Sequence, residues 1–302
     1  MLPFPKCTFH FPECLSDALS IKNELSAMFI AGGTDLGPSM KHRLFTPQHL
    51  ISLQTIPTMK DIELIDNSLH IGAMARLIDV QKSTLVQKKL PVLAQALSLI
   101  GTHTIQHMGT IGGNIMLDTR CLYYNQPEGW RQSINGCLKA DGTVCHVAPK
   151  GKGCYAAHSA DSVPLLWLLD AKMAFHSLNG PQTIPLRTLY GQDGRTWLDG
   201  IKNMILTSLI VPLPEFKLAH RKVRLRASID YAQLLVAVKK QGQMAEAVIS
   251  AVGPQPIHVK GQVNTLPDIA YQATQPLKTH SPNPTWRKHM VRIEVQRALS
   301  GI

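Results

Sequence analysis

The sequence predicts an α+β chain in which a mixed N-terminal part is followed by a separate antiparallel sheet. Three observations predict this class. Strand-like runs alternate with amphipathic helical stretches up to about residue 195, two Gly-Gly turns interrupt that part at 32–33 and 112–113, and strand-like runs with turn signals dominate from about Thr196. A chain of 302 residues is long enough for two or three domains with cores of their own.

In the N-terminal part, the sequence pattern predicts alternating helices and strands. We expect a helix over 15–28, strands over 29–31 and 49–53, a hairpin over 62–73, two helices within 77–100 separated by Pro91, a helix over 165–170 and a hairpin over 172–186. The turns of the two hairpins are Asp66-Asn67 and Asn179-Gly180, which are residue pairs that favour tight turns.

The C-terminal part predicts an antiparallel sheet covered by helices. The expected strands are 204–211, 231–239 and 244–252, and a basic amphipathic helix near 286–299 ends the part. We place the domain boundary near residue 195.

Composition excludes several classes of function. No apolar run reaches the roughly 18 residues of a membrane span, and the first residues lack the pattern of a cleaved signal peptide, so we expect a cytoplasmic protein, with export as part of a complex left open. The net charge is +11, but the lysines and arginines are scattered without a nucleic-acid-binding motif. A basic surface suits docking onto an acidic subunit or electron carrier equally well, and we expect no nucleic-acid partner.

Each Gly-Gly turn is a candidate phosphate-binding loop. The first, Gly32-Gly33, follows a strand and precedes a helix, so its backbone N–H groups could face a phosphate; a plain β–α turn has the same pattern. The second lies in Gly109-Thr110-Ile111-Gly112-Gly113-Asn114. A dinucleotide needs more than one such loop, because it has a pyrophosphate and two sugars.

Four cysteines follow the second loop in a segment rich in Gly, Pro, Lys, Asn and Asp. They are Cys121, Cys137, Cys145 and Cys154. Such a segment is a long irregular loop unless a bound group orders it, and four thiolates around a metal centre would do so. The spacing is that of neither a zinc ribbon nor a ferredoxin, so an iron–sulfur cluster, zinc and unligated thiols all remain open.

The other candidate side chains are ambiguous from the sequence alone. Asp161 precedes an apolar stretch with Pro164 and is a candidate helix N-cap. His103 and His107 could be ligands but more simply are structural residues of a loop, and His146 is an alternative ligand beside the cysteines.

Three motifs together resemble the FAD-binding subunit of the molybdenum hydroxylase family, which includes xanthine dehydrogenases, carbon monoxide dehydrogenases and aldehyde oxidoreductases. They are Ala-Gly-Gly-Thr-Asp-Leu (31–36), Thr-Ile-Gly-Gly-Asn-Ile (110–115) and the helix start at Asp161. The similarity continues through 221–228 to the terminal helix, so it covers nearly the whole chain. It implies an FAD-binding domain of the PCMH or CO dehydrogenase flavoprotein type over 1–195, with two subdomains divided near 57, and a C-terminal domain of the CO dehydrogenase flavoprotein type over 196–302.

The resemblance also implies which residues hold FAD. The two glycine loops would bind the pyrophosphate and flank the ring, and three further positions match flavin- or ribose-contacting residues. The implied FAD contacts are Met28, Phe29, Ile30, Ala31, Gly32, Gly33, Thr34, Asp35, Leu36, Gly109, Thr110, Gly113, Asn114, Leu117, Asp161 and Lys222. One departure is Gln106-His107, where relatives usually carry Arg-Asn, and we expect it to alter the packing beneath the loop without removing it.

The cysteine segment, 118–160, is an insertion relative to most members of this family. It is similar to a loop that holds a [4Fe–4S] cluster in the flavoprotein subunit of 4-hydroxybenzoyl-CoA reductases, and a periplasmic aldehyde oxidoreductase has a related insertion. The resemblance therefore implies a [4Fe–4S] cluster bound by Cys121, Cys137, Cys145 and Cys154.

The implied function is electron transfer within a heteromeric molybdenum enzyme, with no catalytic residue for the substrate in this chain. Its partners would be a molybdopterin-binding large subunit, a [2Fe–2S] small subunit and an external electron carrier such as ferredoxin or NAD(P)H, and the reaction could be reduction of an aromatic thioester. A stand-alone flavin oxidase and a zinc-stapled interaction protein remain alternatives of other classes.

Overall fold

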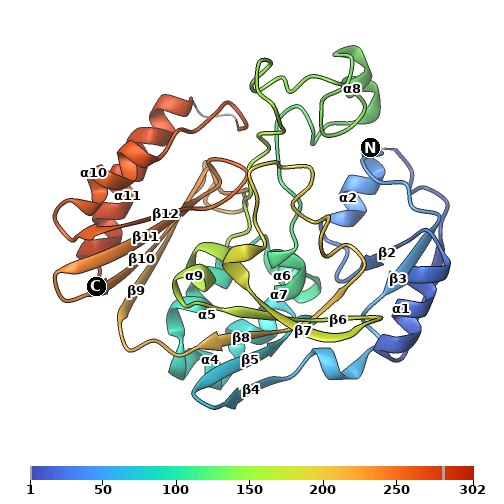
Figure 1. Ribbon diagram of the computed structural model, residues 1–302, viewed down its shortest axis with the longest axis horizontal. Helices are drawn as coiled ribbons and strands as arrows, with labels where there is room; N and C mark the ends of the chain where they lie inside the picture. Colours follow the sequence, from blue (N-terminus) through green and yellow to red (C-terminus); the bar gives the residue numbers. More distant parts are fainter. Residues whose placement is uncertain (1, 281–282) are drawn as a thin grey trace.

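The computed structural model describes residues 2–280 and 283–302 and has the expected α+β architecture (Figure 1). Its helices are α1 (Leu15–Glu24), α2 (Leu36–Lys41), α3 (Leu77–Lys82), α4 (Thr84–Lys89), α5 (Pro91–Ser98), α6 (His103–Met108), α7 (Ile111–Ile115), α8 (Glu128–Ser133), α9 (Val163–Leu168), α10 (Leu266–Ala273) and α11 (Pro284–Ser300), with 3₁₀ turns η1 (Pro57–Met59) and η2 (Leu186–Thr188). Its strands are β1 (Thr8–His10), β2 (Ala27–Ile30), β3 (His49–Ser52), β4 (Ile62–Ile65), β5 (Ser68–Gly72), β6 (Lys172–Ser177), β7 (Gly180–Pro185), β8 (Ile205–Pro212), β9 (Lys217–Val223), β10 (Leu234–Gln241), β11 (Met244–Ser250) and β12 (Ile257–Gln262).

A small parallel sheet at the N-terminal end presents the first glycine turn. Its strand order is β1-β3-β2, and β3 pairs in parallel with both neighbours. Helix α1 is shorter than the 15–28 predicted, because β2 already begins at Ala27. Strand β2 leads through Gly32 and Gly33 into α2, so the predicted strand–turn–helix order is confirmed.

The stretch 77–100 contains three helices where we expected two. Pro91 begins α5 as predicted, because proline suits the first helical turn. The additional break is at Ser83, whose hydroxyl accepts a hydrogen bond from the Val86 amide and caps α4.

A five-stranded antiparallel sheet with the order β4-β5-β8-β6-β7 forms the second layer. Both predicted hairpins are present in it, as β4–β5 and β6–β7. Strand β8 differs from expectation, since we assigned 204–211 to the C-terminal sheet. Its Leu209 pairs with Ile71 of β5 and Met173 of β6 and lies in the same apolar core. We therefore propose a domain boundary at 213–216, between β8 and β9, in place of 195, and keep a subdomain boundary near 57, where η1 lies.

The C-terminal sheet has the order β12-β11-β10-β9 and is antiparallel throughout. Helices α10 and α11 cover one face of it, as Figure 1 shows, and enclose a second apolar core. Helix α9 packs against β10 and β11, so the two parts of the chain contact each other beside Asp161.

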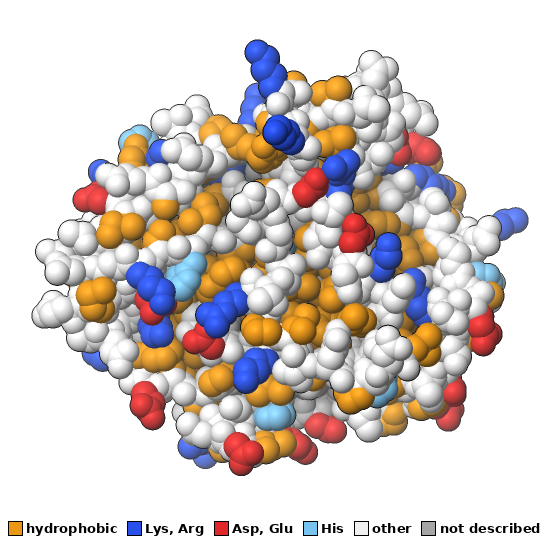
Figure 2. Space-filling model, in the orientation of Figure 1, with side chains coloured by type: hydrophobic (Ala, Val, Ile, Leu, Met, Phe, Trp, Pro, Cys, Tyr) orange, Lys and Arg blue, Asp and Glu red, His pale blue; other side chains and the backbone are white. Residues whose placement is uncertain are grey.

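The cysteine insertion projects from the body of the protein beside α2, with α8 as its one helix (Figure 1). Among the described residues, no helix combines the length and apolar character needed to cross a membrane. On the face shown in Figure 2, lysine and arginine side chains are distributed singly among acidic and apolar ones, in line with the scatter in the sequence.

Candidate functional site

The two glycine loops lie against each other, although they are far apart in the chain. A Cβ on Gly32 would lie 1.8 Å from the Met108 carbonyl oxygen and 3.1 Å from Gly109 Cα. A Cβ on Gly109 would in turn lie 3.4 Å from the Thr34 hydroxyl. A side chain at position 32 would prevent this approach, so glycine there allows the two loops to lie against each other.

The first loop leaves a row of backbone amides available. Gly33 has a φ of +69°, which is the left-handed region that glycine adopts without strain. Within residues 2–280 and 283–302, the backbone amides of 32–36 donate to no protein acceptor, whereas the next amide, Gly37, donates to the Gly33 carbonyl. Consecutive unpaired N–H groups next to a helix start suit an anionic ligand such as a diphosphate.

The second loop is more internally bonded than the first. The Thr110 hydroxyl accepts from the Gly113 amide at 3.1 Å, and the Gly112 amide donates to the Ala73 carbonyl. The Asn114 side chain points to the start of α9, where its Oδ1 accepts from the Ser162 hydroxyl at 2.7 Å. These contacts fix the loop as one wall of the site and leave the first loop to supply most of the free amides.

Gln106 accounts for the packing beneath the second loop. Its side chain is buried, and its amide nitrogen donates to the Ser98 carbonyl at 3.1 Å and the Ile100 carbonyl at 3.0 Å. Its Oε1 accepts from the Gln81 side chain. A neutral amide thus supports the loop at this position.

Asp161 and Lys222 form a buried ion pair between the two parts of the chain. Lys222 Nζ lies 2.5 Å from Asp161 Oδ1, and the two side chains are 2% and 8% exposed. The predicted role of Asp161 as N-cap is wrong, because Ser162 occupies that position and α9 begins at Val163. Burial raises the pKa of the Asp161 carboxyl, and the Lys222 ammonium opposes that shift.

The strand that carries Lys222 presents a row of basic side chains to the N-terminal part. Lys222 also donates to the Leu99 carbonyl at 2.9 Å, and Arg224 reaches the same oxygen at 3.5 Å. His220 donates through Nε2 to the Asp161 carbonyl at 3.0 Å, and burial lowers its pKa to about 4. The alternation of His220 and Lys222 along β9, continued by Arg224 directly after the strand, could have indicated this row in the sequence.

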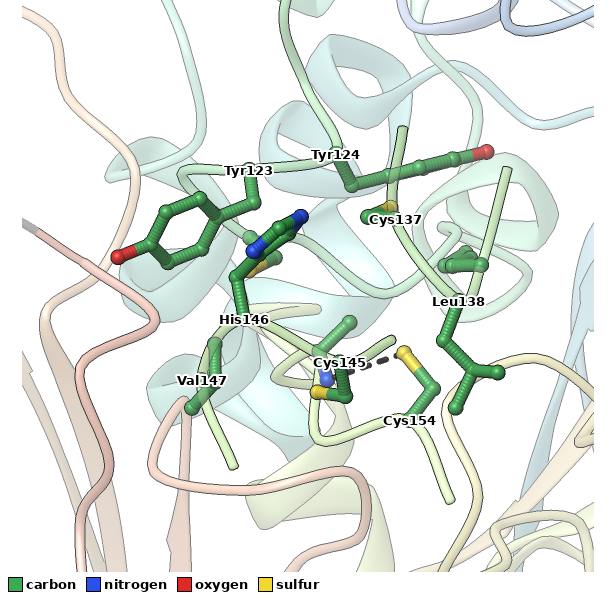
Figure 3. Close-up of a pocket in the computed structure, with 11 residues that line it drawn as sticks. Tyr123, Tyr124, Cys137, Leu138, Cys145, His146, Val147 and Cys154 are labelled. Carbon is green, nitrogen blue, oxygen red and sulfur yellow. Dashed lines mark hydrogen bonds between the residues drawn. The ribbon is translucent and has the colours of Figure 1, made fainter. Parts of the chain in front are cut away.

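All four cysteines of the insertion line one cavity (Figure 3). They are buried free thiols, and they come from irregular stretches of the insertion that are far apart in sequence. The Ala156 amide donates to Cys154 Sγ at 3.4 Å, which is the dashed contact in Figure 3. Burial raises the pKa of the Cys121 and Cys154 thiols to about 11, so they are protonated near neutral pH unless a metal displaces the protons.

Residues 5–214 match the family model described as the FAD binding domain in molybdopterin dehydrogenase. The chain belongs to this family. It is thus a flavoprotein chain of the oxidoreductase class, and the glycine loops described above lie within the matched range.

Two curated relatives extend this finding. The aldehyde oxidoreductase FAD-binding subunit PaoB of Escherichia coli K12 is 34% identical over 233 residues, which cover 73% of this chain and 72% of that subunit. The carbon monoxide dehydrogenase medium chain of Hydrogenophaga pseudoflava is 38% identical over 117 residues, covering 38% of this chain and 40% of that one.

Solved structures show the same fold over the whole length. A chain of carbon monoxide dehydrogenase from Hydrogenophaga pseudoflava superposes with a TM-score of 0.78 at 23% identity, covering 99% of this chain and 98% of that one. A chain of quinoline 2-oxidoreductase from Pseudomonas putida 86 gives a TM-score of 0.77 at 19% identity, with the same coverage. At these identities the likeness establishes the fold alone.

In this FAD-binding chain, two residues that contact the first glycine loop or its partner, Arg120 and Tyr231, were not among the predicted site residues, whereas Asp35 was. Arg120 Nη1 pairs with Asp35 Oδ1 at 2.7 Å, and the Arg120 guanidinium lies 3.7 Å from the centre of the Tyr231 ring. Burial raises the pKa of Asp35, and Arg120 counteracts the shift. The three side chains join the first loop, the insertion and the C-terminal domain, and no local pattern in the sequence indicates that contact.

The remaining predicted residues occupy varied surroundings. Leu117 packs, partly buried, on the main core. The segment 103–108 is helix α6, not the loop we expected, and His107 Nδ1 donates to the His103 carbonyl at 2.8 Å. His146 Nε2 donates to the Gly136 carbonyl at 2.6 Å, and its ring faces Tyr123 at the side of the cysteine cavity (Figure 3).

Among residues 2–280 and 283–302, no group of three or more histidine, cysteine, aspartate or glutamate side chains is arranged to hold a metal ion. The predicted [4Fe–4S] cluster therefore stays a proposal. What the cavity does contain, besides the thiols, is Lys139, whose ammonium is ion-paired with Asp118 at 2.6 Å.

Proposed function

We propose that this chain is the FAD- and [4Fe–4S]-containing electron-transfer subunit of a heteromeric molybdenum hydroxylase. The observation that carries the proposal is the juxtaposition of two abutting glycine loops with a cavity lined by four cysteines. Arg120 links the two, since it pairs with Asp35 of the first loop and directly precedes Cys121.

The glycine loops fit the flavin dinucleotide. The free amides of 32–36 suit the pyrophosphate, and the loop of 109–114 forms the facing wall. Asp161 and Lys222 supply a carboxylate acceptor and an ammonium donor at the junction of the two domains. When bound, FAD supplies two-electron chemistry that can be divided into single-electron steps. The residues of this chain bind and orient it.

We favour a cluster over a single zinc ion in the cysteine cavity. Zinc holds four thiolates about 2.3 Å from one centre, which requires a compact group of ligands. All four cysteines line the same cavity, and among the described residues they form no group already arranged around a single metal ion. Iron and sulfide atoms between the thiolates allow a wider spacing, and burial with an N–H donor to sulfur is typical of cluster sites.

We propose three kinds of partner. A molybdopterin-binding large subunit would carry out substrate chemistry, a [2Fe–2S] small subunit would relay electrons, and an external carrier, ferredoxin or NAD(P)H, would exchange them with this chain. The net charge of +11 favours acidic surfaces on such partners. Six free cysteines suit a reducing compartment, and we keep the cytoplasm as the proposed location.

Aldehyde oxidation is the substrate class that we favour for the complex. The relative named as an aldehyde oxidoreductase subunit is 34% identical over 73% of this chain. Reduction of an aromatic thioester such as 4-hydroxybenzoyl-CoA is the second candidate, which the cysteine insertion favours. Turnover of an aldehyde with a dye acceptor by the intact complex, compared with dithionite-driven reduction of the thioester, separates the two.

The cofactor proposal is tested on the full chain purified without oxygen. We expect about one FAD and about four iron and four sulfide ions per chain, the content of one [4Fe–4S] cluster. Cys137→Ser should lose the iron and keep the flavin, while Cys14→Ser, which alters an exposed thiol, should keep both. Wild-type protein that contains flavin but no iron, or zinc in its place, would overturn the cluster proposal.

The complex is tested by co-purification. A tagged chain expressed with its neighbouring genes should bring down a molybdenum-containing subunit, and the chain alone should oxidise no aldehyde. Oxidase activity of the isolated chain with oxygen as acceptor would favour the stand-alone flavin oxidase instead.

A further inference from the structure

Lys139 is a buried cation in the wall of the cysteine cavity. Its side chain is 5% exposed, and Nζ pairs with Asp118 Oδ1 at 2.6 Å. Nζ also donates to the Thr119 carbonyl at 3.0 Å and to the Thr119 hydroxyl. It lies 4.4 Å from the centre of the Tyr124 ring, which lines the same cavity. These contacts hold the ammonium in one place, so its charge acts on the cavity from a fixed position.

The other lysines of the insertion differ from Lys139 in exposure. Lys150 and Lys152 lie close to Cys154 in sequence but are exposed to solvent. Water and salt screen an exposed charge strongly, whereas a charge in a low-dielectric surrounding acts over several ångströms with much less attenuation. Removal of the charge at Lys139 should therefore affect the thiols more than removal at Lys152.

We propose that Lys139 raises the reduction potential of the cluster held by the four cysteines, and that Asp118 moderates this effect. The inference rests on the [4Fe–4S] centre of the proposed function. Reduction adds one electron, and hence one negative charge, to a site that already has four thiolate ligands. A fixed cation stabilises the reduced form more than the oxidised form, because attraction grows with the charge on the cluster. Net charge near the sulfur atoms is one of the factors that set such potentials.

The ion pair between Asp118 and Lys139 also connects the segment after the second glycine loop with the cysteine insertion. Asp118 directly follows Leu117 at the exit of the second glycine loop, and Lys139 belongs to the middle of the insertion. The pair therefore ties the flavin side of the site to the cluster side. A change in charge at either residue acts on the electron step between the two centres.

The test is an anaerobic potentiometric titration of the full chain with dithionite and mediators, followed by the paramagnetic signal of the one-electron-reduced cluster. Lys139→Met should lower the midpoint potential by the equivalent of at least a tenfold change in the reduction equilibrium, which is 59 mV for one electron. Asp118→Asn should raise it, and Lys139→Arg should stay close to wild type. Lys152→Met, which removes an exposed charge from the same segment, is the matched control and should produce a much smaller shift.

Each outcome decides the proposal. Equal shifts for Lys139→Met and Lys152→Met, or no shift with full iron content, would overturn it. If Lys139→Met loses its iron, the titration of Asp118→Asn decides: a midpoint potential above that of the wild type supports the proposal, and an unchanged one overturns it. Absence of iron and sulfide from the wild-type chain contradicts the cluster itself and is thereby distinguished from failure at Lys139.

Discussion

The two glycine loops and the cysteine insertion are neighbouring parts of one site, yet they are held in place by different forces. The loops are held by close backbone contacts and by elements of the two sheets, such as Gly32 against Met108 and Gly112 against Ala73. The insertion has one short helix. It is attached to the rest of the chain by the buried Arg131 side chain, which donates to the His42 and Arg43 carbonyls, and by single backbone bonds such as the one from the Leu122 amide to the Thr279 carbonyl. Lys139 bonds within the insertion. A flavin site can therefore exist before its ligand binds, whereas the order of the insertion depends on fewer contacts and on the group that we propose the cysteines bind.

Gly32→Ala tests whether close backbone contacts hold the glycine loops in place, and it has the largest expected effect. The added Cβ would lie 1.8 Å from a backbone oxygen, which cannot move aside as a flexible side chain would. We expect a cost of about 3 kcal/mol, and if it falls on flavin binding, roughly a hundredfold weaker affinity. FAD content and thermal unfolding measure the effect. Gly37→Ala on α2, where nothing lies within 4 Å of the added Cβ, is the control and should keep its flavin.

Arg131→Ala tests whether a buried polar side chain holds the cysteine insertion in place. The Arg131 side chain is 1% exposed and donates to the carbonyls of His42, Arg43 and Gln126, besides pairing with Asp141. Loss of these bonds should cost about 4 kcal/mol and release the insertion. We expect fast proteolysis within 118–160 and loss of iron, with flavin retained.

The control for Arg131→Ala is Arg187→Ala, which removes an exposed ion pair with Asp170. Exposed pairs contribute little, so this variant should keep both cofactors and resist proteolysis like the wild type. If Arg131→Ala lost flavin and iron together, the two regions would not be held independently.

The segment that joins the two regions should make the protein sensitive to acid. His158 is fully buried against Tyr190 and Trp197, and burial lowers its pKa to about 3, compared with 6.5 for a free histidine. The unfolded chain thus binds a proton that the folded chain does not, and stability falls as the pH decreases from 6.5 towards 3. Between pH 7 and pH 4 the loss should be about 3 kcal/mol.

His158→Phe should remove most of that acid sensitivity, and unfolding by urea at several pH values measures it. His176→Phe, at a half-buried position on β6, should leave the pH dependence unchanged. An acid-induced loss of stability that is the same in His158→Phe as in the wild type would assign the sensitivity to other groups.

The smallest expected effect concerns the cap of the second loop. Thr110→Ala removes the hydroxyl that accepts from the Gly113 amide and should cost about 1 kcal/mol, together with a modest loss of flavin affinity. Thr102→Ala removes a comparable cap from the start of α6, the end of that helix farther from the second glycine loop, and should cost as much stability without changing flavin affinity. Equal flavin affinity in the two variants would show that flavin binding does not require the hydrogen bond between the Thr110 hydroxyl and the Gly113 amide.

The sequence alone predicted the parts whose signals are local. Glycine turns, proline breaks and alternating apolar residues act on neighbouring residues, so both hairpins and the strand–turn–helix at Gly32 were predicted correctly. The sequence-based prediction missed the helix break at Ser83. The hydroxyl of Ser83 caps a new helix, although the helical pattern of apolar residues continues through this stretch.

Strand pairing and the long-range ion pairs depend on tertiary contacts. Strand β8 was assigned to the wrong sheet. Its partners Ile71 and Met173 lie far away in the chain, and the sequence pattern of a strand does not indicate which strand it pairs with. For the same reason no local pattern revealed that Asp161 would pair with Lys222, that Arg120 would reach Asp35, or that Lys139 would be buried beside the cysteines.

The amino-acid sequence by itself determined which chemical groups this protein has available: glycines that free backbone amides, and four thiols in a segment with little apolar content. The tertiary structure decided which of those groups meet and which charges are shielded from water. The reason is that side-chain burial and long-range ion pairs depend on the packing of whole domains, whereas turns and helix starts depend on a few adjacent residues.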